Sequence, residues 1–301
     1  MRIGVAATPD VALPTLNWLQ QTEHSLDLVI TQPDKRSGRG QSVQQTVVAD
    51  WADHNGIRVV KPNNTSELIE EIYGLDLIVT IGYGVLLPVS ILKIPAHGFL
   101  NLHFSILPAY RGAAPAQHAL LNGETRTGVT VFQLDKGMDT GPIFSQMYLD
   151  IQPSWRSYEL LMELAKLGPD AVSKAISMIE NGDSPTAQFG EISVAPKIFK
   201  DEARIDFSNS PEQVVNLIRA FTYEPGAWTL WKGDPFKITS ARFSDQSFDQ
   251  PGQIFSTKDK VFVSVKGGAI EVLTVIPAGK KEMSAMEWAR GARLIGGEIF
   301  G

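Results

Sequence analysis

The chain has 301 residues, of which 43% are hydrophobic and 20% charged, and it contains no cysteine. This apolar fraction excludes a disordered chain, and the lack of cysteine excludes a disulfide-stapled fold and thiolate chemistry. No apolar run approaches the roughly 20 residues that cross a bilayer, and the first apolar run is too short for a signal peptide. We therefore expect a cytoplasmic protein with no membrane partner. The net charge of −6 argues weakly against nucleic acid as a partner.

Strand-like and helical stretches alternate through the first 181 residues. Residues 75–81 are apolar except for Asp76 and Thr80, which is typical of a central strand buried on both faces. The pattern predicts an α/β fold with a Rossmann-like, mostly parallel sheet. We expect strands at 2–7, 26–31, 58–60, 75–81, 98–102, 128–134 and 141–151, helices at 10–19, 47–54, 66–73, 113–121 and 158–181, and a polar loop at 32–45.

The pattern changes after residue 182. Gly and Pro interrupt the next stretch, which favours a linker, and one helix at 211–220 precedes several short strands. Short strands separated by Gly and Pro predict a small, OB-like β-barrel as the C-terminal domain. Because the length exceeds what one core usually serves, we divide the chain into an α/β domain at 1–188, a linker at 189–205 and a barrel domain at 206–301.

The first strand lacks the glycine fingerprint of a dinucleotide site. It ends in Ala6-Ala7-Thr8-Pro9-Asp10, and Ser37-Gly38-Arg39-Gly40 after the second strand lacks the Lys-Ser/Thr of a phosphate loop. The sheet is therefore predicted to serve another purpose than binding NAD.

Asn101 and His103 stand two residues apart at the carboxyl end of a predicted central strand. Their side chains leave an extended strand on the same face, at the edge where open α/β sheets place their sites. An amide donor beside an imidazole suits stabilisation of an oxyanion and transfer of a proton. Asp139, in a glycine-flanked turn, could orient that histidine. The alternative is structural: a strand end, a buried histidine and a capped turn.

These residues carry a resemblance. Asn-x-His, followed by Ser105-Ile106-Leu107-Pro108 and by Asp139-Thr140-Gly141, is similar to the catalytic set of the 10-formyltetrahydrofolate-dependent formyltransferases. Further segments along the whole chain resemble the tRNA-directed members, the methionyl-tRNA formyltransferases: Thr8-Pro9-Asp10, Thr31-Gln32-Pro33-Asp34, Ser37-Gly38-Arg39-Gly40, Tyr110-Arg111-Gly112-Ala113-Ala114-Pro115, Glu202-Ala203-Arg204-Ile205-Asp206-Phe207 and Pro277-Ala278-Gly279-Lys280-Lys281.

The resemblance implies a reaction. The formyl group of 10-formyltetrahydrofolate passes to the amino group of methionine on initiator Met-tRNA, without a metal, in a protein expected to be a monomer. Asn101 would donate to the oxygen that becomes negative in the tetrahedral species. His103 would assist that oxygen or relay the amine's proton, and Asp139 would set its tautomer and protonation. Which group is the base stays open.

The resemblance also implies two binding sites. For folate it implies Tyr83, Gly84, Val85, Leu86, Leu87, Pro88, Ser105, Ile106, Leu107 and Pro108, with the 134–141 loop around the pterin. Ile106, where the family usually has Leu, and Phe104 depart mildly from the pattern. For tRNA it implies a loop with Lys35, Arg36 and Arg39, and a barrel with Lys280 and Lys281. Gln41, Ser42, Gln44 and Gln45 make this loop less basic than expected of the family.

The distribution of charge answers the objection to nucleic acid. The first 190 residues hold 13 basic and 19 acidic side chains, whereas the remainder holds 14 of each. The acidic excess therefore lies in the predicted catalytic half. The remaining histidines show no spacing typical of metal ligands.

Two other functions compete. A formyltransferase acting on a nucleotide-sugar amine or a purine precursor would share the Asn-x-His and Asp core, but the segment 202–281 resembles the tRNA-directed enzymes. A non-catalytic folate- or RNA-binding relative would not need all of Asn101, His103 and Asp139.

Overall fold

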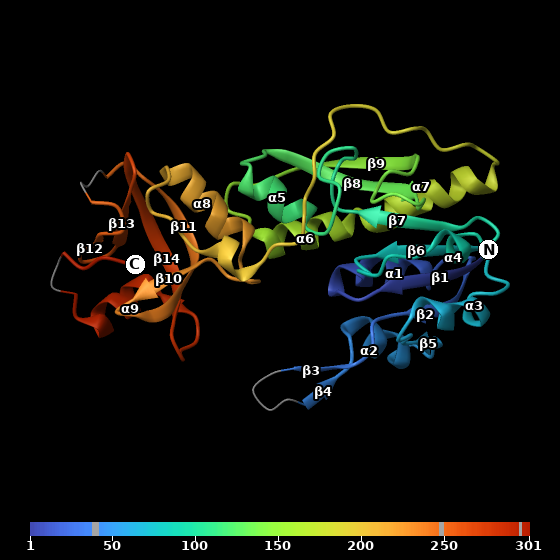
Figure 1. The fold of residues 1–301 in the computed structure, drawn as a ribbon, viewed down its shortest axis with the longest axis horizontal. Helices are drawn as coiled ribbons and strands as arrows, with labels where there is room; N and C mark the ends of the chain where they lie inside the picture. The colour runs from blue at the N-terminus through green and yellow to red at the C-terminus, as the bar shows by residue number, and fades with distance from the viewer. Residues whose placement is uncertain (38–41, 247–249, 295–296) are drawn as a thin grey trace. The chain divides into compact units, whose positions relative to one another are not determined.

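The computed structural model describes residues 1–37, 42–246, 250–294 and 297–301 (Figure 1). The chain divides into two compact units. Unit 1 comprises residues 1–115, 126–150 and 161–196, and unit 2 comprises residues 116–125, 151–160 and 197–301. The units therefore interleave along the chain between residues 115 and 161. The division at 188 and 205 stays a prediction.

Unit 1 is an α/β unit in which strands and helices alternate, as the hydrophobic pattern predicts. Its strands are β1 (Arg2–Ala7), β2 (Ser25–Ile30), β3 (Lys35–Ser37), β4 (Ser42–Gln44), β5 (Val59–Val60), β6 (Leu77–Ile81), β7 (Phe99–His103), β8 (Arg126–Gln133) and β9 (Ile143–Asp150). The helices here and at the boundary with unit 2 are α1 (Leu13–Leu19), α2 (Val47–His54), α3 (Leu68–Glu71), α4 (Val89–Leu92), α5 (Pro115–Leu121), α6 (Ser157–Lys166) and α7 (Gly168–Glu180).

The main sheet of unit 1 has the strand order β5-β2-β1-β6-β7-β8-β9. The pairs from β5 to β7 are parallel, and β8 and β9 continue the sheet antiparallel. The order reverses between β1 and β6, so the carboxyl ends of β1, β6 and β7 form the edge where open sheets bind ligands. The predicted Rossmann-like, mostly parallel sheet is confirmed.

Helices cover both faces of this sheet. α1 and α7 pack on one face, where α7 runs against β7, β8 and β9. The other face carries α3, α4 and a core to which Ala6, Ile30, Ile78 and Phe99 contribute from the strands. Because side chains alternate along a strand, Asn101 and His103 share the face of Phe99. This alternation places Asn101 and His103, two of the three predicted catalytic residues, on the α4 side of the sheet.

Two predictions for this unit are wrong in detail. The expected loop at 32–45 contains an antiparallel ribbon, β3–β4, in which Lys35 pairs with Gln44. Its strands are three residues long and polar, so they give no hydrophobic alternation to detect. The single helix expected at 158–181 is two helices, because Pro169 at the start of α7 cannot continue the hydrogen-bond ladder of α6.

Unit 2 is built on a curled antiparallel sheet of order β10-β11-β14-β13-β12, with β15 paired to β14. Its strands are β10 (Trp228–Trp231), β11 (Asp234–Ser244), β12 (Ile254–Ser256), β13 (Val261–Val265), β14 (Gly268–Pro277) and β15 (Met283–Ser284), and its own helices are α8 (Pro211–Ala220) and α9 (Ala285–Ala292). Register shifts in β11 near Ser240 bend the strand.

The end of the chain joins the two edges of this sheet. The amide of Gly301 donates to the carbonyl of Leu230 in β10, and the amide of Ile254 in β12 donates to the carbonyl of Glu298. Phe300 packs inside against Trp288 and Phe236. This closure gives the curled sheet the character of the predicted small barrel.

The helix α9 was not expected from the sequence. It begins with a capping box, in which the side chains of Ser284 and Glu287 each accept from the other residue's backbone amide. A Ser followed three residues later by a Glu is the sequence pattern of such a box. Among the described helices of both units, none combines the length and the apolar character needed to span a membrane.

Candidate functional site

His103 ends β7 with its side chain only 6% exposed. Its Nε2 atom lies 2.9 Å from the carbonyl oxygen of Tyr110, and the edge of Phe132 lies against the ring. A carbonyl oxygen only accepts, so Nε2 carries the proton and the neutral ring has its lone pair on Nδ1. The tautomer of His103 is thus set by the backbone of Tyr110, and not by Asp139 as the sequence suggested.

Burial lowers the pKa of His103 below its usual value of about 6.5, and this effect outweighs the opposing pull of the Asp139 carboxylate and of the hydrogen bond to Tyr110. The imidazole is consequently neutral near pH 7. A neutral imidazole with Nδ1 unprotonated is equipped to accept a proton.

Asp139 faces that lone pair. Its Oδ2 lies 3.8 Å from Nδ1 of His103, and its side chain is 12% exposed. The separation is too long for a hydrogen bond. The residue has φ of 53°, a left-handed conformation that aspartate tolerates better than most residues. Oδ2 also accepts a 2.7 Å hydrogen bond from the amide of Gly112, which fixes the direction of the carboxylate.

Asn101 lies two residues before His103 on the same face and is half-buried. Among the described residues, its side-chain amide has no hydrogen-bond partner. Its N–H groups are therefore available to a ligand. The structure thus brings together two of the three predicted catalytic residues in direct apposition, His103 and Asp139, with Asn101 beside them on the strand.

Gln188 is a residue of this site that sequence reasoning missed. Its Nε2 donates to the carbonyl oxygens of Asp139 and Gly141, at 2.8 and 2.9 Å. Its Oε1 accepts from Nε and Nη2 of Arg111, at 3.2 and 2.6 Å. Gln188 lies in a stretch without periodicity, and no feature of the sequence marks it. Tyr110 and Gly112 belong to the 110–115 segment, which is one of those that carry the resemblance, but the sequence predicted no role for either residue.

The residues predicted to bind folate lie in two segments next to this site. Tyr83 and Leu87 belong to the core on the face of Phe99, together with Leu92 and Leu134. Leu86 is 80% exposed, whereas Ser105 and Leu107 are buried. Ser105 donates to the carbonyl of Ala109, and Leu107 donates its amide to Thr130, so both help to hold the backbone after β7. Gly84, Val85 and Pro88 lie on the 82–88 segment, and Ile106 and Pro108 lie on the 104–109 segment.

The residues predicted to bind tRNA lie in separate units. Lys35 is exposed in β3, where its Nζ donates to Gln32, and Arg36 follows it in the strand. Arg39 lies outside the described residues. Lys61 bridges Asp34 and Gln45 at the base of the ribbon, at 2.6 and 3.0 Å. In unit 2, Lys280 and Lys281 are exposed in the loop between β14 and β15.

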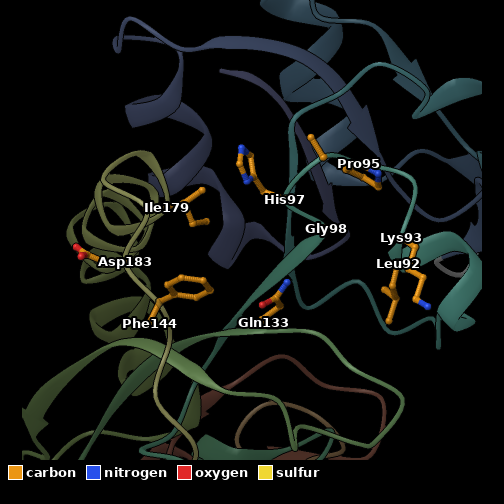
Figure 2. A pocket seen from close by; sticks show the side chains of 11 residues that line it. Leu92, Lys93, Pro95, His97, Gly98, Gln133, Phe144, Ile179 and Asp183 are labelled. Atoms are coloured by element: carbon orange, nitrogen blue, oxygen red, sulfur yellow. The ribbon is translucent and has the colours of Figure 1, made fainter.

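A cavity of about 690 Å³ opens at the other end of β7, near Gly98. Figure 2 shows the side chains of His97, Ile179 and Phe144 around it. None of the predicted site residues lines this cavity. Size alone does not make it the site of chemistry, because the paired His103 and Asp139 lie at the carboxyl end of the strand, where the sheet reverses its order. No group of three His, Asp or Glu side chains suited to a metal occurs in the described part of the chain; the expected absence of a metal stays a prediction.

Comparison with known proteins tests the resemblance. Residues 1–176 match the family described as formyl transferase, and residues 197–293 match the formyl transferase C-terminal domain. Over 308 residues the chain is 40% identical to the methionyl-tRNA formyltransferase of Thermobifida fusca, with 100% of this chain and 99% of that protein covered. The chain belongs to the methionyl-tRNA formyltransferase family. The family predicted from the sequence motifs is confirmed.

Solved structures share the fold of this family member. A methionyl-tRNA formyltransferase from Clostridium thermocellum has a TM-score of 0.59 at 17% identity, covering 91% of this chain and 99% of that one. An N-formyltransferase from Helicobacter canadensis, solved with folinic acid and dTDP-3-aminofucose, has a TM-score of 0.69 at 21% identity, covering 90% and 98%. Identities this low establish the fold alone.

Proposed function

We propose that this formyltransferase transfers the formyl group of 10-formyltetrahydrofolate to the amino group of methionine on initiator Met-tRNA, in the cytoplasm. The observation that carries the proposal is the buried apposition of His103 and Asp139, with Asn101 on the same strand face, in a chain of this family. These three residues are the proposed catalytic set.

His103 is the proposed proton acceptor. Attack by an amine requires that it lose a proton, and Nδ1 is the ring nitrogen with a free lone pair, because Tyr110 holds Nε2–H. Asp139, 3.8 Å away, stabilises the imidazolium that results. Burial keeps the resting ring neutral, so it is ready to accept the proton at pH 7. The carboxylate thus acts when charge develops on the ring.

Asn101 is the proposed oxyanion donor. The donor substrate supplies a formyl carbon whose oxygen gains negative charge as the amine attacks. The Asn101 side chain is unengaged among the described residues and projects from the same strand face as His103. A donor placed in this way is worth roughly 3–4 kcal/mol of barrier in other oxyanion holes.

The residues next to this set suit a flat, partly apolar ligand. Tyr83 and Leu87 anchor the 82–88 segment in the apolar core on the same face, and Leu86 of that segment is 80% exposed. The second element is the 135–140 turn, which is braced by Asp135 as it accepts from the amide of Gly137 and from the hydroxyl of Thr140. The folinic acid with which the Helicobacter canadensis protein was solved supports a folate as the donor. We place the pterin between these two elements.

The tRNA contacts are proposed at two places, the 32–45 segment with Lys35, Arg36 and Arg39, and the β14–β15 loop with Lys280 and Lys281. Lys35, Lys280 and Lys281 are exposed, and exposed cations are what a phosphate backbone requires. A monomer is sufficient, since each unit contains its own core. The alternative acceptor, a nucleotide-sugar amine, is supported by the dTDP-3-aminofucose of one fold neighbour, but that neighbour is only 21% identical.

One assay tests the function. Release of tetrahydrofolate from 10-formyltetrahydrofolate is measured with charged initiator Met-tRNA, with uncharged tRNA, with a dTDP-amino sugar and with no acceptor. We expect turnover with Met-tRNA only. Turnover with the amino sugar and not with Met-tRNA would reassign the acceptor, and none with either would indicate a binding protein.

A further inference from the structure

The segment 186–195, here called the strap, lies in the chain between α7 and the last part of unit 2. It runs along the elements that hold His103 and Asp139. Thr186 exchanges backbone hydrogen bonds with Ile143 at the start of β9. Farther along, Ser193 and Ala195 bond the backbone of Arg111, and the Ser193 hydroxyl accepts from the amide of Tyr110. The strap therefore touches both segments that contact His103, the 110–112 segment and the turn that carries Asp139.

Gln188 is the side chain through which the strap reaches Asp139. Its orientation is unambiguous: Arg111 offers only donors, so it must face the amide oxygen, and the carbonyls of Asp139 and Gly141 only accept, so they must face the amide nitrogen. All four contacts of the amide are thereby satisfied at once. Gln188 is also partly buried, which limits competition from water.

These contacts act on residues 139 and 141 of the turn, whereas Asp135 braces it at Gly137 and Thr140. Asp139 stands in a left-handed conformation, and within the described residues its carboxylate accepts from one amide, that of Gly112. The hydrogen bond from Gln188 to its carbonyl oxygen limits rotation of the peptide about this residue. An aspartate that swung away would leave the 3.8 Å apposition to His103. A displacement of about 1 Å near reacting groups can cost about 100-fold in rate.

We propose that Gln188 is a positioning residue for formyl transfer, which holds the backbone of Asp139 so that its carboxylate faces Nδ1 of His103. The inference rests on the proposed function for its kinetic consequence, but not for the geometry. Arg111 shares the role by holding the amide oxygen of Gln188. The strap thereby ties the geometry of the catalytic pair to the chain segment that enters unit 2.

The decisive variant is Gln188→Glu. It preserves the length of the side chain and the oxygen that accepts from Arg111, but it removes both donors to the turn. Gln188→Met, which also removes the acceptor for Arg111, is the second variant. Gln21→Ala, an exposed glutamine after α1 with no role in the site, is the control.

We expect kcat with Met-tRNA to fall by about 10- to 100-fold in both variants, with KM for either substrate changed less than threefold. Wild-type kcat in Gln188→Glu would overturn the inference. So would a loss confined to the melting temperature, because a merely structural residue would lower the folded fraction and leave kcat of the folded enzyme intact.

A second measurement needs no substrate. Hydrogen exchange is followed at the amide of Gly112, which donates to Asp139, and at the amide of Leu107, which donates to Thr130. In Gln188→Glu we expect exchange at Gly112 to accelerate at least tenfold while Leu107 is unchanged. Equal acceleration at both amides, or at neither, would overturn the inference. If the wild type does not formylate Met-tRNA, the proposed function fails, and the exchange data still decide the role of Gln188.

Discussion

The carbonyl oxygen of Tyr110 lies 2.9 Å from Nε2 of His103 and thereby fixes the tautomer of this histidine. The consequence is that Nδ1, the nitrogen facing Asp139, carries the lone pair of the neutral ring. The two partners of the ring have different tasks: a neutral backbone group orients it, and a carboxylate responds to its charge.

Replacing His103 or Asp139 should lower turnover far more than it weakens substrate binding. We expect His103→Asn to reduce kcat by roughly 100- to 1000-fold, the usual contribution of general acid–base catalysis. Asp139→Asn tolerates the same left-handed backbone and still accepts from Gly112, so it removes the charge selectively. It should also reduce kcat, with binding of both substrates nearly unchanged. His97→Asn, in the loop before β7, serves as the control. Near-normal turnover in either site variant would contradict the assigned roles.

The stability of the protein should depend on pH through His103. Its pKa is lowered in the folded state by burial, so the unfolded chain binds this proton more readily. Below the unfolded pKa of about 6.5, the free energy of unfolding should therefore fall, by up to about 1.4 kcal/mol per pH unit for one proton. We would measure the free energy of unfolding by urea titration from about pH 5 to about pH 8, a range that spans this pKa. It should depend less on pH in His103→Asn than in the wild type. Identical curves would show that His103 does not contribute.

Gly112→Ala should disrupt the site although it adds only one methyl group. The backbone at Gly112 has φ of 127°, and a Cβ atom there would lie 2.5 Å from the carbonyl oxygen of Ala195. The strap must then shift, which moves the amide that orients Asp139. We expect a loss of kcat of about tenfold or more together with a lower melting temperature. Gly56→Ala, at a positive φ of 68° with open space around it, is the matched control for backbone strain alone. Equal effects of the two substitutions would refute the contact with the strap.

Removing the basic side chains of the 32–45 segment should weaken binding of tRNA without altering chemistry. In the triple variant Lys35→Ala, Arg36→Ala and Arg39→Ala, the slope of log Kd against log salt should decrease by roughly 1 for each phosphate that is no longer neutralised. The rate at saturating tRNA should remain near that of the wild type. Replacing Lys93, Lys166 and Lys174 with alanine removes the same charge elsewhere and should leave the slope unchanged. A wild-type slope in the triple variant of the 32–45 segment would argue against this role.

The elements that the sequence predicts best are those with a strong local pattern. The apolar run that becomes β6 and the period of α2 and α8 are visible in the residues themselves, because burial of one face or two imposes a repeat. Asn101 and His103 could be placed on one face for the same reason, since a strand alternates its side chains with a period of two. The polar ribbon β3–β4 lacks such a repeat and could not be detected.

The sequence by itself determined the residue types of the site, the strand that carries two of them, and the family. Only the tertiary structure decided how they meet. Asp139 reaches His103 because a left-handed turn folds back and is held by Gly112 and Gln188, contacts between segments far apart in the chain. Such contacts depend on backbone amides and carbonyls, which every residue possesses, so no pattern of side chains announces them. The protonation of His103 follows the same rule, because burial and a backbone carbonyl set it.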